Sequence, residues 1–201
     1  MNYLAHLYLA EQSSEGLLGS LLGDFVKGRL DDRYPETIRR GIALHRAIDS
    51  FTDAHPLHLE SRNRIGSERR RYAGIIIDVC YDHFLCSHWT EYSSESLACF
   101  SERVYGILRD HRDALPDRLR RMVPHMIADD WLGSYAELEN VGRALDGIAR
   151  RITRSNPLAG AVVEIEANYG ALEGDFRRFF PQLQAQAGQI LSTLVSRPTT
   201  D

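Results

Sequence analysis

Residues 73–89, AGIIIDVCYDHFLCSHW, constrain the fold of this chain more than any other stretch. At about 100° per residue, the apolar side chains of this run point in every direction around a helix axis. The run is too long for a buried strand, and a helical stripe runs through Asp78, Tyr81, Asp82, Leu85 and Trp89. A helix that is apolar on all sides must be enclosed, so we predict a central helix surrounded by others.

Helical periods also dominate the rest of the chain, for example the leucines of EGLLGSLLGDFVKG, residues 15–28. Gly16, Gly19 and Gly23 in this segment each cost up to about 1 kcal/mol of helix propensity, which predicts close approach of a neighbouring backbone. A chain of 201 residues, 43% of them hydrophobic, can build one substantial core. We predict an all-α, single-domain helical bundle over residues 1–195, with a flexible tail at 196–201.

Prolines and serines predict several helix boundaries. Pro35 suits the first turn of a helix that contains residues 38–54, and Pro56 ends that helix because the residue before proline is pushed out of the α region. Ser93 or Ser94 is expected to cap a helix that runs to residue 111. Pro116 and Pro124 are expected to split residues 113–135 into two shorter helices.

Composition and charge exclude several function classes. No apolar run reaches 18 residues, so we predict no membrane span, and MNYLAHLYLAEQ lacks the pattern of a signal peptide. The cysteines, Cys80, Cys86 and Cys99, form neither a zinc pattern nor an even disulfide set, which predicts a reducing cytoplasm. A net charge of −4 gives no indication of nucleic-acid binding, and no glycine-rich phosphate loop is present.

Polar residues on apolar helix faces carry the functional signal. In GIALHRAIDSFTDAHP, residues 41–56, His45 lies between Ile42 and Ile48 on the helical wheel, and Asp49 follows one turn later. Asp78 and Asp82 lie one turn apart on the central helix, and Asp24 lies at the inner edge of the leucine stripe. An isolated buried carboxylate costs several kcal/mol, so these groups need partners. A shared divalent cation would be one, and oxygen with imidazole ligands suits Mn²⁺, Mg²⁺ or Fe²⁺.

Ordinary structural roles remain open for each of these residues. A single buried histidine is most often a core residue bonded to a carbonyl, and an Asp pair one turn apart is often a solvated strip. His83 is 100° from Asp82 on the wheel and could be a ligand, an acid or base, or a rim contact. His6 in LAHLYLA is ambiguous for the same reason. The HxxxD and DxxxDH motifs together, both on apolar faces, favour the metal site.

Several motifs together resemble one known family. They are MNYLAHLYLA, LLGDFVKG, GIALHRAIDSFTDAHP, RRRYAGIIIDVCYDHFLCSHW, DDWLGSY and FRRFFPQL. They resemble acyl carrier protein phosphodiesterase, a divergent branch of the HD-domain metal-dependent phosphohydrolases, over residues 1 to about 185. The resemblance implies a Mn²⁺-dependent enzyme that removes 4′-phosphopantetheine from the serine of holo-acyl carrier protein. The doublet here is Asp-His, where the wider HD pattern has His-Asp.

The resemblance and the helix faces together assign the candidate site. Asp24, His45, Asp78 and Asp82 are the expected metal ligands, with Mn²⁺ preferred and Mg²⁺ or Fe²⁺ as alternatives. Asp49 is expected to orient His45 or a water molecule. His83 is expected to protonate the leaving serine oxygen or to hold the phosphate.

Clustered arginines suggest where an acidic carrier protein would dock. Arg69, Arg70 and Arg71 precede the central helix, and DRLRRM adds Arg118, Arg120 and Arg121. The alternative to a docking role is that these arginines are solvated and are balanced by neighbouring acidic residues. Two other functions stay open: an HD-type phosphohydrolase acting on a nucleotide or another small phosphodiester, and a non-enzymatic all-α interaction module. No nucleic-acid or membrane partner is expected, and the sequence leaves the oligomeric state open.

Overall fold

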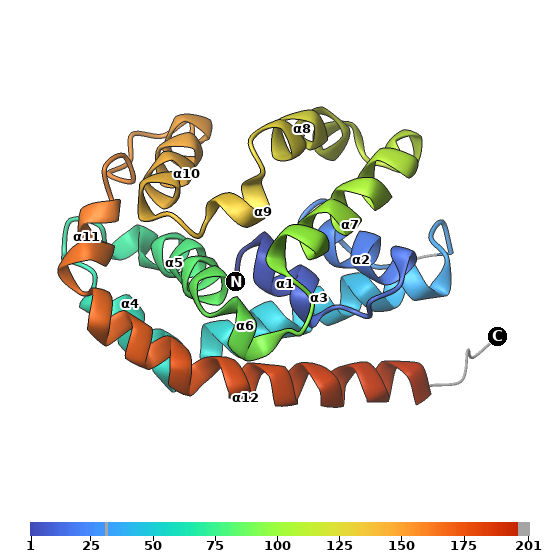
Figure 1. Ribbon diagram of the computed structural model, residues 1–201, viewed down its shortest axis with the longest axis horizontal. Helices are drawn as coiled ribbons and strands as arrows, with labels where there is room; N and C mark the ends of the chain where they lie inside the picture. Colours follow the sequence, from blue (N-terminus) through green and yellow to red (C-terminus); the bar gives the residue numbers. More distant parts are fainter. Residues whose placement is uncertain (31, 197–201) are drawn as a thin grey trace.

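Helix α5 (Ala73–Ser87) is the central helix that the sequence predicts. In the computed structural model, which describes residues 1–30 and 32–196, α5 contacts helices from both ends of the chain. These are α1 (Tyr3–Leu9), α4 (Pro56–Arg64), α10 (Leu138–Arg151), α11 (Val162–Ala167) and α12 (Tyr169–Ser196) (Figure 1). Residues 79–86 of α5 are all buried, as expected for a helix that is apolar on every side.

The other helices complete an all-α architecture. They are α2 (Ser14–Leu22), α3 (Glu36–Ala54), α6 (Trp89–Tyr92), α7 (Leu97–Asp110), α8 (Asp117–Ala128) and α9 (Trp131–Ser134), with 3₁₀ turns at Arg70–Tyr72 and Arg112–Ala114. Helices make up 75% of the structure, and the described residues contain no strand, so the all-α prediction is confirmed. None of the described helices is long and apolar enough to span a membrane.

The buried apolar residues form one cluster, which extends from Met1 to Ala187 and fits the expected single unit. Helix α12 passes along one side of this cluster and packs against α3 and α4 (Figure 1). Ser196 is the last residue of α12. The rest of the expected tail, residues 197–201, lies outside the described residues.

Glycines bring α2 and α3 into close contact, as the sequence predicts. A Cβ atom built at Gly19 would lie 2.9 Å from the Cα atom of Gly41, and one built at Gly41 would lie 2.8 Å from the carbonyl oxygen of Gly16. No side chain can occupy either position without moving a backbone. This close packing fixes α3 against the N-terminal helices, and α3 carries His45 and Asp49.

Three predicted boundaries differ from the structure. Helix α2 ends at Leu22, so Asp24 lies in the turn that follows it, not on the helix. Helix α7 is capped by Ser96, whose hydroxyl accepts from the amide of Cys99, not by Ser93 or Ser94. Helix α8 continues through Pro124, because this proline is exposed and water can reach the carbonyl that loses its hydrogen bond. The predicted end of α3 before Pro56 is confirmed.

Candidate metal centre

Three side chains from α1 and α3 converge on one point. His6, His45 and Asp49 each offer one ligand atom, and these atoms all lie within 4.8 Å of one another. His6 Nε2 is 3.0 Å from Asp49 Oδ1, and His45 Nε2 is 3.3 Å from Asp49 Oδ2. The two imidazole rings stack with centroids 3.7 Å apart. In the described part of the chain this is the one group of His, Cys, Asp and Glu side chains that meets these distances.

Local structure explains how the three side chains meet. The spacing of four residues puts His45 and Asp49 on the same face of α3. Gly23, directly after α2, leaves room for the His45 ring, because a Cβ atom at this position would collide with the imidazole. Asp24 follows and places its Oδ1 atom 3.6 Å from His45 Nε2. Asp24 is about half exposed, so it approaches His45 from the solvent side.

Three of the four imidazole nitrogens in this group lack hydrogen bonds. Both ring nitrogens of His6 and Nδ1 of His45 are buried without a hydrogen-bond partner. His6 Nε2 is close to Asp49, yet the angle between them does not make a hydrogen bond. Buried polar atoms in folded proteins nearly always have partners. Buried imidazole nitrogens without hydrogen-bond partners, next to carboxylate oxygens in one small group, fit a divalent cation.

The pKa values of the two imidazoles differ sharply. Burial lowers the pKa of His6 to about 4, so this ring is neutral at pH 7, the form that binds metal ions. Burial also lowers the pKa of His45, but the carboxylates of Asp24 and Asp49 beside the ring outweigh it and raise the value to about 9. The protonated His45 ring therefore offsets the two carboxylates. A divalent cation at the same point would replace that proton.

A second pair of polar residues lies beside the first group. Asp78 Oδ1 is 3.3 Å from His58 Nε2 and 3.1 Å from the amino nitrogen of Met1, which is 3.8 Å from Asp49 Oδ1. His58 is fully buried, and neither of its ring nitrogens has a hydrogen-bond partner. Sequence reasoning did not single out His58. The signal was weak, because only His58 and Ser61 of the short helix α4 are buried.

Asp82, predicted to be a metal ligand, has different partners in the structure. Its carboxylate accepts from the amides of Leu4 at 2.8 Å and Ala5 at 3.1 Å, so it caps the start of α1. The first amides of a helix have no partner within the helix, which is why a carboxylate is favourable there. Burial raises the pKa of Asp82 to about 7. The structure thus brings Asp24, His45 and Asp49 together and places Asp78 beside them. Asp82 instead forms hydrogen bonds with backbone amides of α1.

The sequence model of the family described as acyl carrier protein phosphodiesterase matches residues 1–183. This chain belongs to the acyl carrier protein phosphodiesterase family. A family relative of that name from Serratia proteamaculans is 39% identical over 188 residues, which cover 93% of this chain and 97% of the relative. One from Escherichia coli O157:H7 is 37% identical over 194 residues, 94% and 98% of the two chains.

These matches confirm the family that the motifs predicted. No solved structure matches the chain. The relationship to HD-domain phosphohydrolases therefore stays a prediction.

His83, which the sequence predicted to act as an acid, is held by Tyr135 and Tyr169. Burial lowers the pKa of His83, so the ring is neutral at pH 7. Nδ1–H then donates to the carbonyl of Tyr135 at 2.7 Å, and Nε2 accepts from the hydroxyl of Tyr169 at 2.9 Å. Both nitrogens are occupied, and the ring connects α5 to the residue that follows α9 and to the first residue of α12. The structure does not bring His83 into the group formed by His6, His45 and Asp49.

Two of the three arginines predicted to dock the carrier protein are bound within the chain. Arg69 donates to the carbonyl of Pro157 and pairs with Glu164 at 3.1 Å. Arg70 donates to the carbonyl of Ile65 and the side chain of Asn63. Arg71 is exposed and has no partner among the described residues. Arg69 and Arg70 thus hold the segment between α4 and α5 in place.

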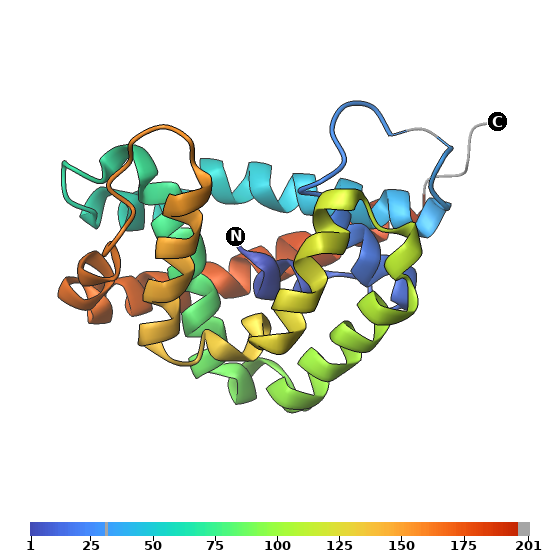
Figure 2. The same cartoon turned by 90° about the horizontal axis from the view of Figure 1, so that it is seen from above.

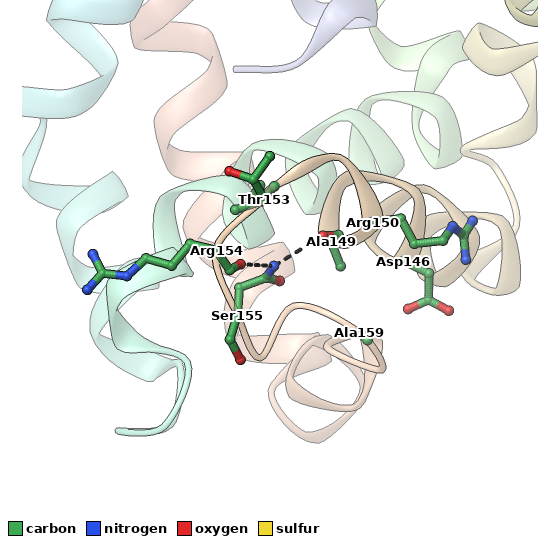
Figure 3. A pocket seen from close by; sticks show the side chains of 9 residues that line it. Asp146, Ala149, Arg150, Thr153, Arg154, Ser155 and Ala159 are labelled. Atoms are coloured by element: carbon green, nitrogen blue, oxygen red, sulfur yellow. Dashed lines mark hydrogen bonds between the residues drawn. The ribbon is translucent and has the colours of Figure 1, made fainter.

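A surface hollow of about 450 Å³ lies at the end of α10 and in the loop that follows (Figure 3). Asp146, Arg150, Ser155 and Ala159 are among the residues that line it. Asn156 closes the loop by donating to the carbonyls of Ala149 and Arg154. No residue of the metal centre lines this hollow, so it is separate from the site.

Proposed function

We propose that this protein hydrolyses the phosphodiester bond between 4′-phosphopantetheine and the serine of holo-acyl carrier protein, with a divalent cation bound by His6, His45 and Asp49. The observation that carries the proposal is the convergence of these three side chains with buried nitrogen atoms that have no hydrogen-bond partner. The curated relatives, which this chain matches over nearly their full length, are named acyl carrier protein phosphodiesterase. The products are apo-carrier protein and free 4′-phosphopantetheine.

Mn²⁺ is the cation we propose, with Fe²⁺ or Mg²⁺ as alternatives. Two imidazole nitrogens and carboxylate oxygens suit Mn²⁺ or Fe²⁺, whereas Mg²⁺ prefers oxygen atoms alone. When bound, the cation supplies positive charge to the phosphoryl oxygens and makes a water molecule more acidic. None of the Cys residues takes part: Cys80 and Cys86 are buried and Cys99 lies on α7.

The chain's own residues divide the remaining tasks. Asp24 faces solvent beside His45, so it completes the ligand set and can accept a proton from a water molecule that enters from outside. Asp78 and His58 form a supporting pair that is linked to Asp49 through the amino group of Met1. Asp82 and His83 have positioning roles, because Asp82 fixes the start of α1, which carries His6, and His83 anchors α5.

Mass spectrometry of holo-carrier protein tests this proposal directly. Incubation with the protein and Mn²⁺ is expected to remove the mass of phosphopantetheine, and a chelator is expected to block the loss. Asp24→Ala and His45→Ala are expected to abolish turnover with helical content unchanged, as measured by circular dichroism. His125→Ala is the matched control, because His125 is exposed on α8 and outside the metal centre.

Two other outcomes would point elsewhere. Hydrolysis of free nucleotides or small phosphodiesters, with holo-carrier protein left intact, would support the alternative function of an HD-type phosphohydrolase that acts on small substrates. A purified protein that carries no metal and whose properties do not change with a chelator would support the second alternative, a non-enzymatic all-α interaction module. A cytoplasmic location stays a prediction that rests on the free cysteines.

A further inference from the structure

The candidate metal centre contains several carboxylates, and their partners are histidines and the amino group of Met1. Asp24 and Asp49 pair with histidines, and Asp78 pairs with His58 and the amino group of Met1. In the described part of the chain, no arginine or lysine forms an ion pair with these carboxylates. A phosphodiester is an anion, and approaching carboxylates repel it. A second source of positive charge is needed near the centre.

Two arginines on different helices are placed to supply that charge. The guanidinium of Arg118, on α8, lies 5.6 Å from the centre of the Phe25 ring, and Phe25 directly follows Asp24. The guanidinium of Arg151, the last residue of α10, lies 6.0 Å from the centre of the Trp131 ring. Helices α8 and α10 stand on either side of the beginning of α1, with α3 behind them (Figure 2). Both side chains are exposed.

Tyr3, at the start of α1, connects these arginines to the metal centre. Burial raises the pKa of the Tyr3 hydroxyl to about 12, the negative charge of Asp24 adds to this effect, and Arg151 and Arg118 oppose it. All three charges therefore act on the same hydroxyl. The contact with Phe25 places Arg118 in the same region as Asp24, and α10, which ends at Arg151, lies on the other side of the beginning of α1 (Figure 2).

The donors of both arginines are free to bind a ligand. Within the described part of the chain, neither Arg118 nor Arg151 has an ion-pair or hydrogen-bond partner. Other arginines on the same two helices are neutralised: Arg120 pairs with Asp117 on α8, and Arg143 pairs with Glu139 on α10. Contact with an aromatic ring orients a guanidinium without using its N–H groups. A planar fork of free N–H donors matches two oxygens of a phosphate.

We propose that Arg118 and Arg151 form an anion-binding pair that holds the phosphodiester of the substrate at the mouth of the metal centre. This inference rests on the proposed function for the identity of the phosphodiester, but phosphate binding itself can be tested without it. The helices that carry the two arginines lie on either side of the beginning of α1 (Figure 2), and each arginine would contribute its free N–H donors to the same phosphate group. The ligand class is a phosphate ester anion, not the acidic surface of the carrier protein.

Titration of the Mn²⁺-loaded protein with inorganic phosphate tests the pair. Arg118→Ala and Arg151→Ala are each expected to weaken phosphate binding about tenfold, as the loss of one charge-assisted contact predicts. Lysine at either position is expected to restore only part of the affinity, because it lacks the planar fork. Arg120→Ala and Arg143→Ala are matched controls on the same helices and are expected to bind phosphate normally. Mn²⁺ affinity and the melting temperature are expected to stay unchanged in all variants.

Kinetics with two substrates separates this role from protein docking. The arginine variants are expected to raise the KM for bis(4-nitrophenyl) phosphate and for holo-carrier protein to a similar extent. Unchanged phosphate affinity in the double variant would overturn the proposal. An effect on holo-carrier protein alone would also overturn it, because it would assign the arginines to the carrier surface. Failure of the wild-type protein to act on holo-carrier protein, with phosphate binding intact, would reject the proposed function but retain the anion-binding pair.

Discussion

Two buried polar clusters of this protein differ in how completely their atoms are bonded. The Asp175 cluster is centred on α12, where Asp175 is 1% exposed. Its carboxylate accepts from Ser61 Oγ at 2.8 Å, from Arg64 Nε at 2.7 Å and from Arg178 Nη2 at 2.5 Å. The Ser61 hydroxyl also bonds Tyr81 at 2.8 Å. In the metal centre, by contrast, both nitrogens of His6 have no hydrogen-bond partner.

The contrast distinguishes a fully bonded structural network from the candidate ligand site. A buried polar group without a partner costs roughly 1–3 kcal/mol, so an unsatisfied cluster persists only where something else compensates. The Asp175 cluster needs nothing further, because α4, α5 and α12 supply all its partners. In the candidate metal centre, three imidazole nitrogens have no partner within the described residues, and a bound cation would satisfy such donors. Replacing residues in the two clusters should therefore have opposite effects on binding and on folding.

The largest effect is expected from His6→Leu. This change is expected to reduce Mn²⁺ affinity and turnover by more than about a hundredfold, because it removes a ligand and not merely a supporting residue. The metal-free protein is expected to keep its stability within about 1 kcal/mol, since an unbonded imidazole is replaced by an apolar side chain of similar size. Isothermal titration and thermal unfolding measure the two quantities. Normal Mn²⁺ binding by this variant would remove His6 from the site.

Asp175→Ala is expected to show the reverse behaviour. Loss of the charge-assisted hydrogen bonds is expected to lower the free energy of unfolding by about 2 kcal/mol, with Mn²⁺ affinity unchanged. Chemical denaturation measures this loss. A large loss of metal binding without a loss of stability would contradict the assignment of this cluster to structure.

The same cluster predicts a pH dependence. Burial raises the pKa of Asp175, but hydrogen bonds from Arg64, Ser61 and Arg178 outweigh it and lower the pKa below 3.8. Its stabilisation is thus complete above pH 3.8 and is lost as the pH falls through the lowered value. Asp175→Asn is expected to remove this component of acid sensitivity, which denaturation curves at several pH values can show. An unchanged acid profile would contradict it.

A smaller effect is expected from Gly23→Ala. The backbone at Gly23 is in the ordinary right-handed helical region, so alanine is strained only by its Cβ contact with the His45 ring. The ring must shift, and Mn²⁺ affinity is expected to fall about tenfold, in line with the roughly 1–3 kcal/mol that overpacking costs. Gly106→Ala on α7 is the matched control, because its added Cβ would meet no atom within 4 Å. That control is expected to bind Mn²⁺ normally and to gain up to about 1 kcal/mol of stability.

The helix faces of the site were predictable from the sequence. The spacing of His45 and Asp49 put both on the apolar face of one helix, and the structure brings them together there. The apolar surface of residues 73–89 required a buried central helix, which α5 is. The motifs also indicated the family, which the comparisons confirm. Each of these follows from local periodicity or from local sequence pattern.

The partners of each side chain were not predictable in the same way. Asp82 shares an apolar face with Asp78, yet it bonds the amides of α1, whereas Asp78 lies beside His58. The sequence left the role of His6 ambiguous, but the structure places His6 in one group with His45 and Asp49. Arg69 and Arg70 looked available for docking, although they bind carbonyls and Glu164. A helical wheel gives the direction of a side chain but not the element that lies opposite it.

The sequence by itself determined the helices, the faces that they bury, and the chemical types available on those faces. Tertiary structure alone decided which of these residues meet, because convergence depends on how α1, α3 and α5 are placed relative to one another. That placement comes from packing between residues far apart in the chain, such as the glycine contacts of α2 with α3 and the capping of α1 by Asp82. Local patterns do not contain these long-range contacts.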